Sequence, residues 1–386
     1  MTDPRRPVVT GYGAVGHWGS GLEPLWAALA EGRPAGRPWV PDDGGPERFA
    51  APLPDGYRPH PDIPRSVRHA LDRGSAMALD AALQAAAMAG LGPGSGDARR
   101  FALIDALPLR APGQPAIYVP YGHTVARALG IRGPVESVAA GEAGSALAVA
   151  RAARLVAEGV VDVAFAGGAQ ALQAQLLAHL AELGASDEPA RPFDRRHRGF
   201  VPGEGAAFLV IEAAEHAAQR GVPAVAALTG ACVTFDPGAE PLAFSEPAET
   251  GRAVQGALAA AGMLQGQVDL VVAGADGRIA RDFTEGYAIR RVFGRHAHYA
   301  TVTAPKGAIG NALAASAALA AVVALECIRR QAVPPIAGFE EPEPDLELSY
   351  ARAVRPERTE AVVVTAFALG GTNAALIVER ASADRP

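Results

Sequence analysis

The sequence predicts an α/β fold in which two related halves each form a sheet, with helices packed between and outside the sheets. Short apolar runs typical of buried strands alternate with long alanine-rich segments typical of helices. The second half repeats the rhythm of the first, and we therefore place the halves at residues 1–225 and 226–386. With 386 residues, of which 49% are hydrophobic, the chain is long enough to bury the large core that such a fold needs.

The first half begins with a strand at Val8-Val9, for which Gly11-Tyr12-Gly13 is the predicted turn. A loop rich in proline and glycine is predicted from Arg33 to Pro64. The helices of this half are predicted at Leu22–Ala30, Ser75–Ala89 and Gly144–Glu158, and the later strands at Phe101–Ile104, Val135–Val138, Asp162–Ala166 (ending in Gly167-Gly168) and Ala206–Glu212. The near-continuous apolar run of the last strand is typical of a sheet that is covered on both faces.

The second half follows the same alternation. Its helices are predicted at Ala248–Ala261, Gly286–Phe293 and Ala312–Arg329, and its strands at Val268–Ala273, Ala361–Thr365 and Ala374–Val378.

Composition excludes several classes of function. A formal net charge of −6 argues against a nucleic-acid partner, because such binding depends on clustered Lys and Arg. The two cysteines, Cys232 and Cys327, form no zinc or disulfide spacing, as expected of a protein in a reducing cytoplasm. No apolar run reaches the roughly 18 residues of a membrane span. We expect a soluble cytoplasmic protein without metal, cofactor, nucleic-acid partner or membrane partner.

Four segments carry a family resemblance. VVTGYGAVGHWGSGLEPLWAALAEGR from Val8, RPFDRRHRGFVPGEGAAFLVIE from Arg191, VTAPKGAIGNALAASAALAAVVAL from Val302 and FALGGTNAALIV from Phe367 resemble, in this order, the β-ketoacyl-acyl-carrier-protein synthases of the thiolase superfamily. The resemblance implies the thiolase fold, with two βαβαβαββ halves in an αβαβα layered sandwich, and an obligate dimer.

The residues that carry the family's chemistry are missing. Decarboxylative condensation needs a cysteine thiolate at a helix N-terminus and two imidazoles that stabilise the developing enolate. The matched positions hold Glu142, Gly274 and Asn311, whereas the family's lysine is present as Lys306. Neither a glycine nor an asparagine can do the proton chemistry of an imidazole near neutral pH. The nine histidines lie at other positions, and we predict surface or helix-capping roles for all of them.

Glu142 is predicted to be a structural residue. A carboxylate gains from a helix N-terminus as a thiolate does, but an acyl-glutamate would be a hydrolytically labile mixed anhydride. We expect Glu142 to accept backbone hydrogen bonds or to form an ion pair, and Lys306 to pair with Glu142 or with another buried acid.

Within the family, this pattern resembles the chain-length factors, the ketosynthase β subunits of type II polyketide synthases. These lack the cysteine and show EAG or QAG at that turn, as Glu142-Ala143-Gly144 does here. The resemblance implies a heterodimer with a cysteine-bearing ketosynthase α subunit, which works with an acyl carrier protein. The family's acyl pocket would place Phe367, Leu369 and Asn373 beside the degenerate site. Residues 101–133 depart from the family pattern, so Ile117, Tyr118 and Tyr121 are further pocket candidates on local grounds only.

Three functions remain open from the sequence. The first is a noncatalytic chain-length factor that shapes the acyl tunnel in polyketide or polyene biosynthesis. A second is an acyltransferase or malonyl decarboxylase with altered chemistry at Glu142, Lys306 and Asn311. The third is a homodimeric scaffold or a docking module for a carrier protein.

Overall fold

One continuous sheet runs through the protein. The computed structural model describes residues 3–63, 68, 71–92, 94–110, 121–240 and 243–381. In this part of the chain the sheet order is β13-β11-β10-β15-β16-β9-β1-β8-β7-β5-β6. The strands before residue 225 are β1 (Pro7–Gly16), β5 (Phe101–Ala106), β6 (Val135–Val138), β7 (Val163–Gln170) and β8 (Gly205–Ala213). Those after it are β9 (Ala226–Phe235), β10 (Leu270–Val272), β11 (Thr301–Thr303), β13 (Ser349–Tyr350), β15 (Ala361–Phe367) and β16 (Thr372–Arg380).

The two sets of strands are connected in the same way. The order β1-β8-β7-β5-β6 of the first set is repeated as β9-β16-β15-β10-β11 in the second, with β13 added at the outer edge. The sets meet where Val8 and Val9 of β1 pair with Ala227 and Ala226 of β9. The predicted α/β fold built from two similar sets of strands is therefore confirmed, whereas the division of the chain at residue 225 stays a prediction.

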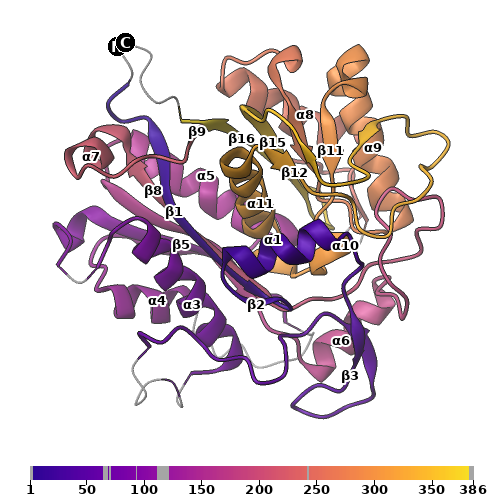
Figure 1. Cartoon of the computed structure of the whole chain (residues 1–386), viewed down its shortest axis with the longest axis horizontal. Helices are drawn as coiled ribbons and strands as arrows, with labels where there is room; N and C mark the ends of the chain where they lie inside the picture. Colours follow the sequence, from indigo (N-terminus) through magenta and orange to yellow (C-terminus); the bar gives the residue numbers. More distant parts are fainter. Residues whose placement is uncertain are drawn as a thin grey trace.

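Helices cover both faces of each set, in five layers (Figure 1). On the outside of the first set lie α3 (Arg73–Met88) and α4 (Tyr121–Leu129), and on the outside of the second lie α8 (Pro247–Ala260) and α9 (Ile279–Phe293). Between the sets are α5 (Gly144–Ala157) and α11 (Ser316–Arg330), which contact each other and strands of both sets. The remaining helices are α1 (Leu22–Glu31), α6 (Ala174–Glu182), α7 (Ala214–Gln219) and α10 (Lys306–Ile309).

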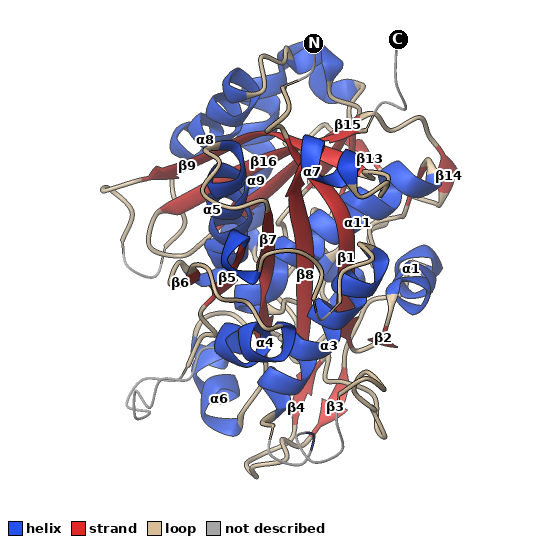
Figure 2. Ribbon diagram, turned by 90° about the vertical axis from the view of Figure 1, so that its left-hand side faces the viewer, coloured by secondary structure: helices blue, strands red, loops and turns tan. Residues whose placement is uncertain are grey.

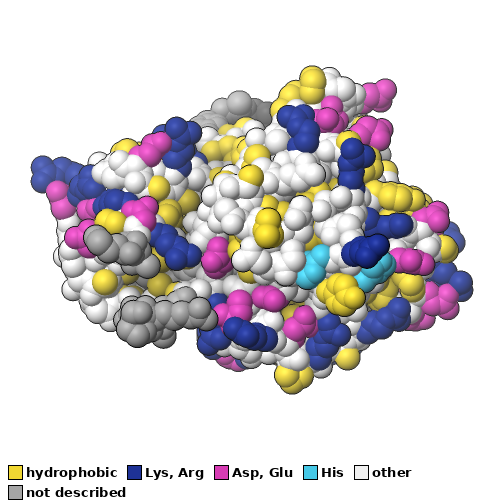
Figure 3. Space-filling view, turned by 90° about the horizontal axis from the view of Figure 1, so that it is seen from above, with side chains coloured by type: hydrophobic (Ala, Val, Ile, Leu, Met, Phe, Trp, Pro, Cys, Tyr) yellow, Lys and Arg dark blue, Asp and Glu magenta, His cyan; other side chains and the backbone are white. Residues whose placement is uncertain are grey.

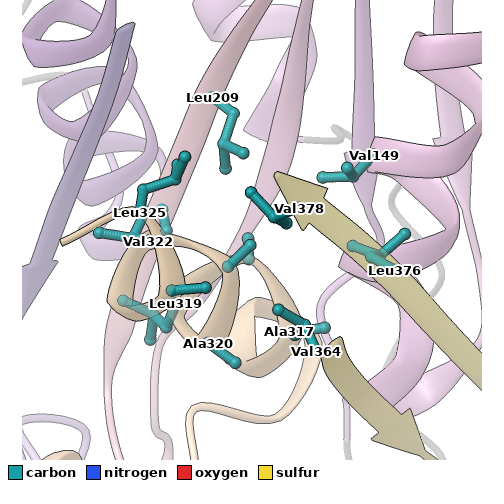
Figure 4. Packing of buried hydrophobic residues seen from close by; sticks show 14 of the residues in the cluster. Val149, Leu209, Ala317, Leu319, Ala320, Val322, Leu325, Val364, Leu376 and Val378 are labelled. Carbon is teal, nitrogen blue, oxygen red and sulfur yellow. The ribbon is translucent and has the colours of Figure 1, made fainter. Parts of the chain in front are cut away.

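The core is centred on α11, whose residues 316–328 are all buried. Leu319, Val322 and Leu325 of this helix belong to one buried hydrophobic cluster with Leu209 of β8 and Val378 of β16 (Figure 4). Each buried Leu or Val contributes about 1.5–3 kcal/mol relative to an exposed one. The many alanines of α11 keep the helix thin enough to fit between the two sets of strands.

The glycines that were predicted to form a turn after the first strand lie inside β1 instead. They allow α3 to approach the sheet: a Cβ at Gly11 would lie 2.1 Å from the carbonyl oxygen of Ala85, and one at Gly13 would lie 2.3 Å from that of Ala81. Gly167, with which the predicted strand was expected to end, lies inside β7, where a Cβ would lie 2.0 Å from the carbonyl oxygen of Ala207 in the neighbouring strand β8.

Other differences concern short or polar elements. The predicted loop from Arg33 to Pro64 contains a hairpin of β3 (Arg37–Trp39) and β4 (Arg48–Ala50). Three further short strands are β2 (Gly19–Ser20), β12 (Ala332–Val333) and β14 (Arg355–Pro356). The helix predicted from Gly286 begins seven residues earlier at Ile279, and α4, α6, β9 and β11 were not predicted.

On the face shown in Figure 3, basic and acidic side chains are interspersed and lie mainly toward the periphery of the view. Within the described ranges, the search for a helix of sufficient length and hydropathy to span a membrane found none.

Candidate functional site

Glu142 lies at the junction between β6 and α5, in the single-turn helix η2 (Gly141–Ala143). Gly141 has a φ of 52°, in the left-handed region that favours glycine, and this turn directs the chain from the strand into the helix. The Glu142 side chain therefore projects from the N-terminal end of α5, where the helix dipole favours a negative charge. Only 5% of the residue is exposed.

Three cations surround this carboxylate. Arg278 Nη2 lies 2.5 Å from Glu142 Oε1, Lys306 Nζ lies 3.0 Å from Oε2, and Arg281 Nη1 donates to Oε2 as well. Asp276 supplies a second buried carboxylate, 2.7 Å from Arg278 Nη2. We call these five residues the buried ion cluster. The predicted pairing of Lys306 with Glu142 is present.

Aromatic rings cover the arginines of the buried ion cluster. The Arg278 guanidinium lies 4.4 Å from the centre of the Phe200 ring and 4.9 Å from that of Phe244, and Arg281 lies 5.1 Å from Phe244. These cation–π contacts add to the ion pairs and keep water from them.

The electrostatics fix Glu142 in its ionised form. Burial alone would raise the pKa of Glu142, but the charges of Arg278, Arg281 and Lys306 outweigh burial and hold the pKa well below its ordinary value. Burial and the neighbouring Arg281 lower the pKa of the Lys306 ammonium. A carboxylate with so low a pKa, tied to three cations, is a poor general base and a poor nucleophile.

The other two matched positions also have structural partners. A Cβ at Gly274 would lie 2.8 Å from Arg281 Nη2, so the arginine fills the space next to this residue. Asn311 donates to Asp276 Oδ2 at 2.9 Å, and its own Oδ1 accepts hydrogen bonds from the Leu313 N–H and the Ser316 hydroxyl. The structure thus brings Glu142 and Lys306 together with Gly274 and Asn311.

Little space remains at this place. The cavity beside Glu142 has a volume of about 10 Å³ and is lined by residues such as Gly274, Arg281 and Lys306. One water molecule needs about that much space. An acyl thioester cannot enter the site in this conformation.

The pocket candidates are dispersed. Phe367 is buried in the same hydrophobic cluster as Val363, and Asn373 is buried with its amide donating to Ser245 Oγ at 2.9 Å. Neither of them, nor the half-buried Leu369 in the turn after β15, is among the described residues that line the cavity beside Glu142. The pocket role of these three residues stays a prediction.

Tyr121 begins α4 and packs on Gly74, where a Cβ would lie 2.1 Å from the ring. It lines a separate polar cavity of about 260 Å³ with Leu109 and Gln170, and burial raises the pKa of its phenol to about 12. The candidates Ile117 and Tyr118 lie outside the described residues.

Sequence reasoning missed Arg278, Arg281 and the role of Asp276. The available signal was a group of charged residues directly after a strand, at the position of the family's first histidine motif. The surface role predicted for His197 is wrong, because only 4% of it is exposed and its Nδ1 lies 3.0 Å from Asp282 Oδ2. Among the described residues, no group of three or more His, Cys, Asp or Glu is arranged to bind a metal.

Comparisons with known proteins agree with the fold. Residues 122–217 match the β-ketoacyl synthase N-terminal domain and residues 225–340 its C-terminal domain. Nodulation protein E of Rhizobium leguminosarum bv. trifolii is 32% identical over 96% of this chain and 98% of its own length. The oxytetracycline polyketide putative β-ketoacyl synthase 1 of Streptomyces rimosus is 32% identical over 97% of each chain.

Two solved structures share nearly the whole architecture. The ishigamide ketosynthase/chain length factor superposes with a TM-score of 0.86 at 27% identity, covering 98% of this chain and 100% of its own. A β-ketoacyl synthase from Burkholderia phymatum STM815 gives a TM-score of 0.87 at 27% identity with the same coverage. By sequence and by fold, this chain belongs to the β-ketoacyl synthase family.

Proposed function

We propose that this chain is a noncatalytic chain-length factor of type II polyketide or polyene biosynthesis, which pairs with a cysteine-bearing ketosynthase. The observation that carries the proposal is the buried ion cluster. Where a condensing enzyme needs a thiolate and room for a thioester, this chain has a carboxylate held by Arg278, Arg281 and Lys306, and a cavity of about 10 Å³.

The cysteines support a noncatalytic role. Cys327 is buried and Cys232 is half-buried, and burial raises the pKa of both thiols, away from the thiolate that condensation requires. Both cysteines are free, as suits a protein that works with its partner in the cytoplasm.

A surface for the partner lies beside β6, α5 and β9 (Figure 2). Among the described strands β6 pairs only with β5, so its other edge offers backbone groups for strand addition. Next to it, an apolar groove of about 630 Å³ is lined by Val138, Leu147 and Val233 among others. We call β6 and this groove the edge face. Val233 is 44% exposed and the neighbouring Phe235 61%, as expected of a surface that a partner covers.

The partner that we propose for the edge face is a ketosynthase of the same fold. The ishigamide relative is a ketosynthase/chain length factor. Such a partner would present an equivalent edge strand, so that two sheets join across a pseudo-two-fold axis and bury more than about 2,000 Å². The partner's cysteine would hold the acyl chain delivered by an acyl carrier protein. This chain would limit product length by walling part of the tunnel.

Co-expression with a cysteine-bearing ketosynthase from the same gene neighbourhood tests the proposal. We expect a one-to-one complex by light scattering and a polyketide product that requires both chains. With Glu142→Ala, product should still form. Loss of product in a well-folded, fully assembled complex, or turnover of malonyl carrier protein by the purified chain alone, would favour an enzyme with altered chemistry. A stable homodimer that ignores the ketosynthase would favour a scaffold.

A further inference from the structure

The turn that carries Glu142 connects the edge face to the rest of the protein. β6 ends at Val138 and α5 begins at Gly144, and residues of both line the apolar groove. β6 itself contacts mainly β5, α4 and α5, all of which belong to the first half. The single turn η2 between them contacts α11, β15 and β16 of the second half. This turn is therefore one of the places where the second half supports the edge of the sheet, together with the contacts of α5 with α11, β9 and β16.

All the cations of the buried ion cluster that pair with this turn belong to the second half of the chain. All three cations come from beyond residue 270: Arg278 precedes α9, Arg281 lies in its first turn, and Lys306 begins α10. Each donates to the Glu142 carboxylate across at least 136 residues of sequence. Without that carboxylate, the ion pairs between the second half and the turn would be lost, and the guanidinium and ammonium groups would repel one another.

We infer that the degenerate catalytic site now acts as an anchor for partner binding, with Glu142 as the positioning residue that keeps the edge face in its binding conformation. This inference rests on the proposed function, because it takes the ketosynthase as the occupant of the edge face. It gives Glu142 a role in assembly in place of the lost chemistry. The same contacts explain why a buried charge is kept where an apolar side chain could fill the space.

The test compares the dissociation constant of the heterodimer for wild type and for Glu142→Ala, by titration against the purified ketosynthase. If the binding-competent conformation falls to about one tenth of the population, the dissociation constant rises about tenfold. Lys306→Met removes one of the three cations, and we expect a smaller weakening in the same direction. If Glu142→Ala fails to fold, the dissociation constant of the milder Lys306→Met variant still tests the inference.

Glu326→Ala is the matched control. Glu326 is also buried and accepts hydrogen bonds from Tyr12, Arg329 and Arg330, but it lies near the C-terminal end of α11, away from the edge face. We expect it to lower thermal stability and to leave the dissociation constant unchanged. Hydrogen exchange adds a local readout: in Glu142→Ala, amides of β6 and of the first turns of α5 should exchange at least tenfold faster, while those of α8 keep the wild-type rate.

The outcomes separate the two proposals. If wild-type protein forms no complex with the ketosynthase, the proposed function fails and the inference fails with it. If the complex forms and Glu142→Ala binds as tightly as wild type, the inference is wrong while the proposed function stands. Equal weakening by Glu142→Ala and Glu326→Ala would point to general destabilisation and would also overturn the inference.

Discussion

Replacing Glu142 by glutamine removes one charge from the buried ion cluster with almost no change in volume. The side chain is 6% exposed, so solvent does little to screen the loss. Arg278, Arg281 and Lys306 would then face Asp276 without their main counter-ion. Breaking a buried ion pair by removing one partner costs about 3–5 kcal/mol, because the opposite charge stays buried and uncompensated. We expect a loss of this size in the free energy of unfolding.

Urea unfolding at pH 7 measures the loss, and calorimetry gives a second estimate. For a chain of 386 residues, the entropy of unfolding is roughly 0.8 kcal/mol per degree, so the Tm should fall by about 4–6 °C. Glu158→Gln is the control. Glu158 lies at the other end of α5 in an exposed pair with Arg154 at 2.6 Å, and such pairs contribute about 0.5 kcal/mol or less. A Glu142→Gln variant as stable as this control would refute the reasoning.

The effect should also depend on pH. The folded state holds the pKa of Glu142 well below its ordinary value of 4.5, since the three cations outweigh burial, which by itself raises it. A depressed pKa contributes stability that is fully present above the unfolded value and is lost as pH falls through the folded one. The stability difference between wild type and Glu142→Gln should therefore be constant from pH 7 to pH 5 and shrink only below about 4.5. A difference that is already reduced at pH 6 would contradict this assignment.

Three further predictions concern other residues. Burial opposes protonation of His197, but its hydrogen bond with Asp282 prevails and raises the pKa above 6.5. Wild type should therefore be more stable than His197→Gln at pH 6, and this advantage should vanish as pH rises through the raised pKa. Thermal unfolding of both proteins at pH 6 and pH 9 measures the difference. Gly274→His should lower the free energy of unfolding in urea by about 1–3 kcal/mol, because its Cβ would lie 2.8 Å from Arg281 Nη2. If the two side chains compete for one space, the second change Arg281→Gly should recover part of that loss. Leu325→Ala should cost about 2–5 kcal/mol because the side chain is fully buried in the core around α11, and a loss below 1 kcal/mol would contradict that packing.

Local patterns gave the parts of the fold that depend on near neighbours. The strand predicted at Val135–Val138 has these same bounds in the structure, where two valines enclose Glu136 and Ser137 and Gly133-Pro134 precede the strand. The glycines of β1 were misread as a turn because their role depends on α3, whose contact with the strand cannot be read from neighbouring residues. β9 was missed because its strand pattern is interrupted by Gly230 and by polar threonines, and only its pairing with β16 and β1 makes it a strand.

The candidate site shows the same limit. Motif spacing identified the positions where the family's cysteine and histidines are absent, because these positions follow strands in a fixed order. It did not identify the arginines that pair with Glu142 at this place. Arg278 and Arg281 reach Glu142 from 136 and 139 residues away, and only the fold shows that they are its partners. His197 was assigned to the surface for the same reason, since Asp282 approaches it only in the folded protein.

The periodicity of the amino-acid sequence was enough to establish an α/β fold of two similar sets of strands, and the family resemblance predicts that the catalytic positions carry no thiolate and no imidazole here. Periodicity and residue identity are local properties, so they can be read from the sequence without knowing the tertiary contacts. The contacts of the folded protein were needed to show which groups surround Glu142. A buried carboxylate is stable only when opposite charges lie close to it, and their positions depend on the fold. Here folding places three cations from the opposite half of the chain around Glu142.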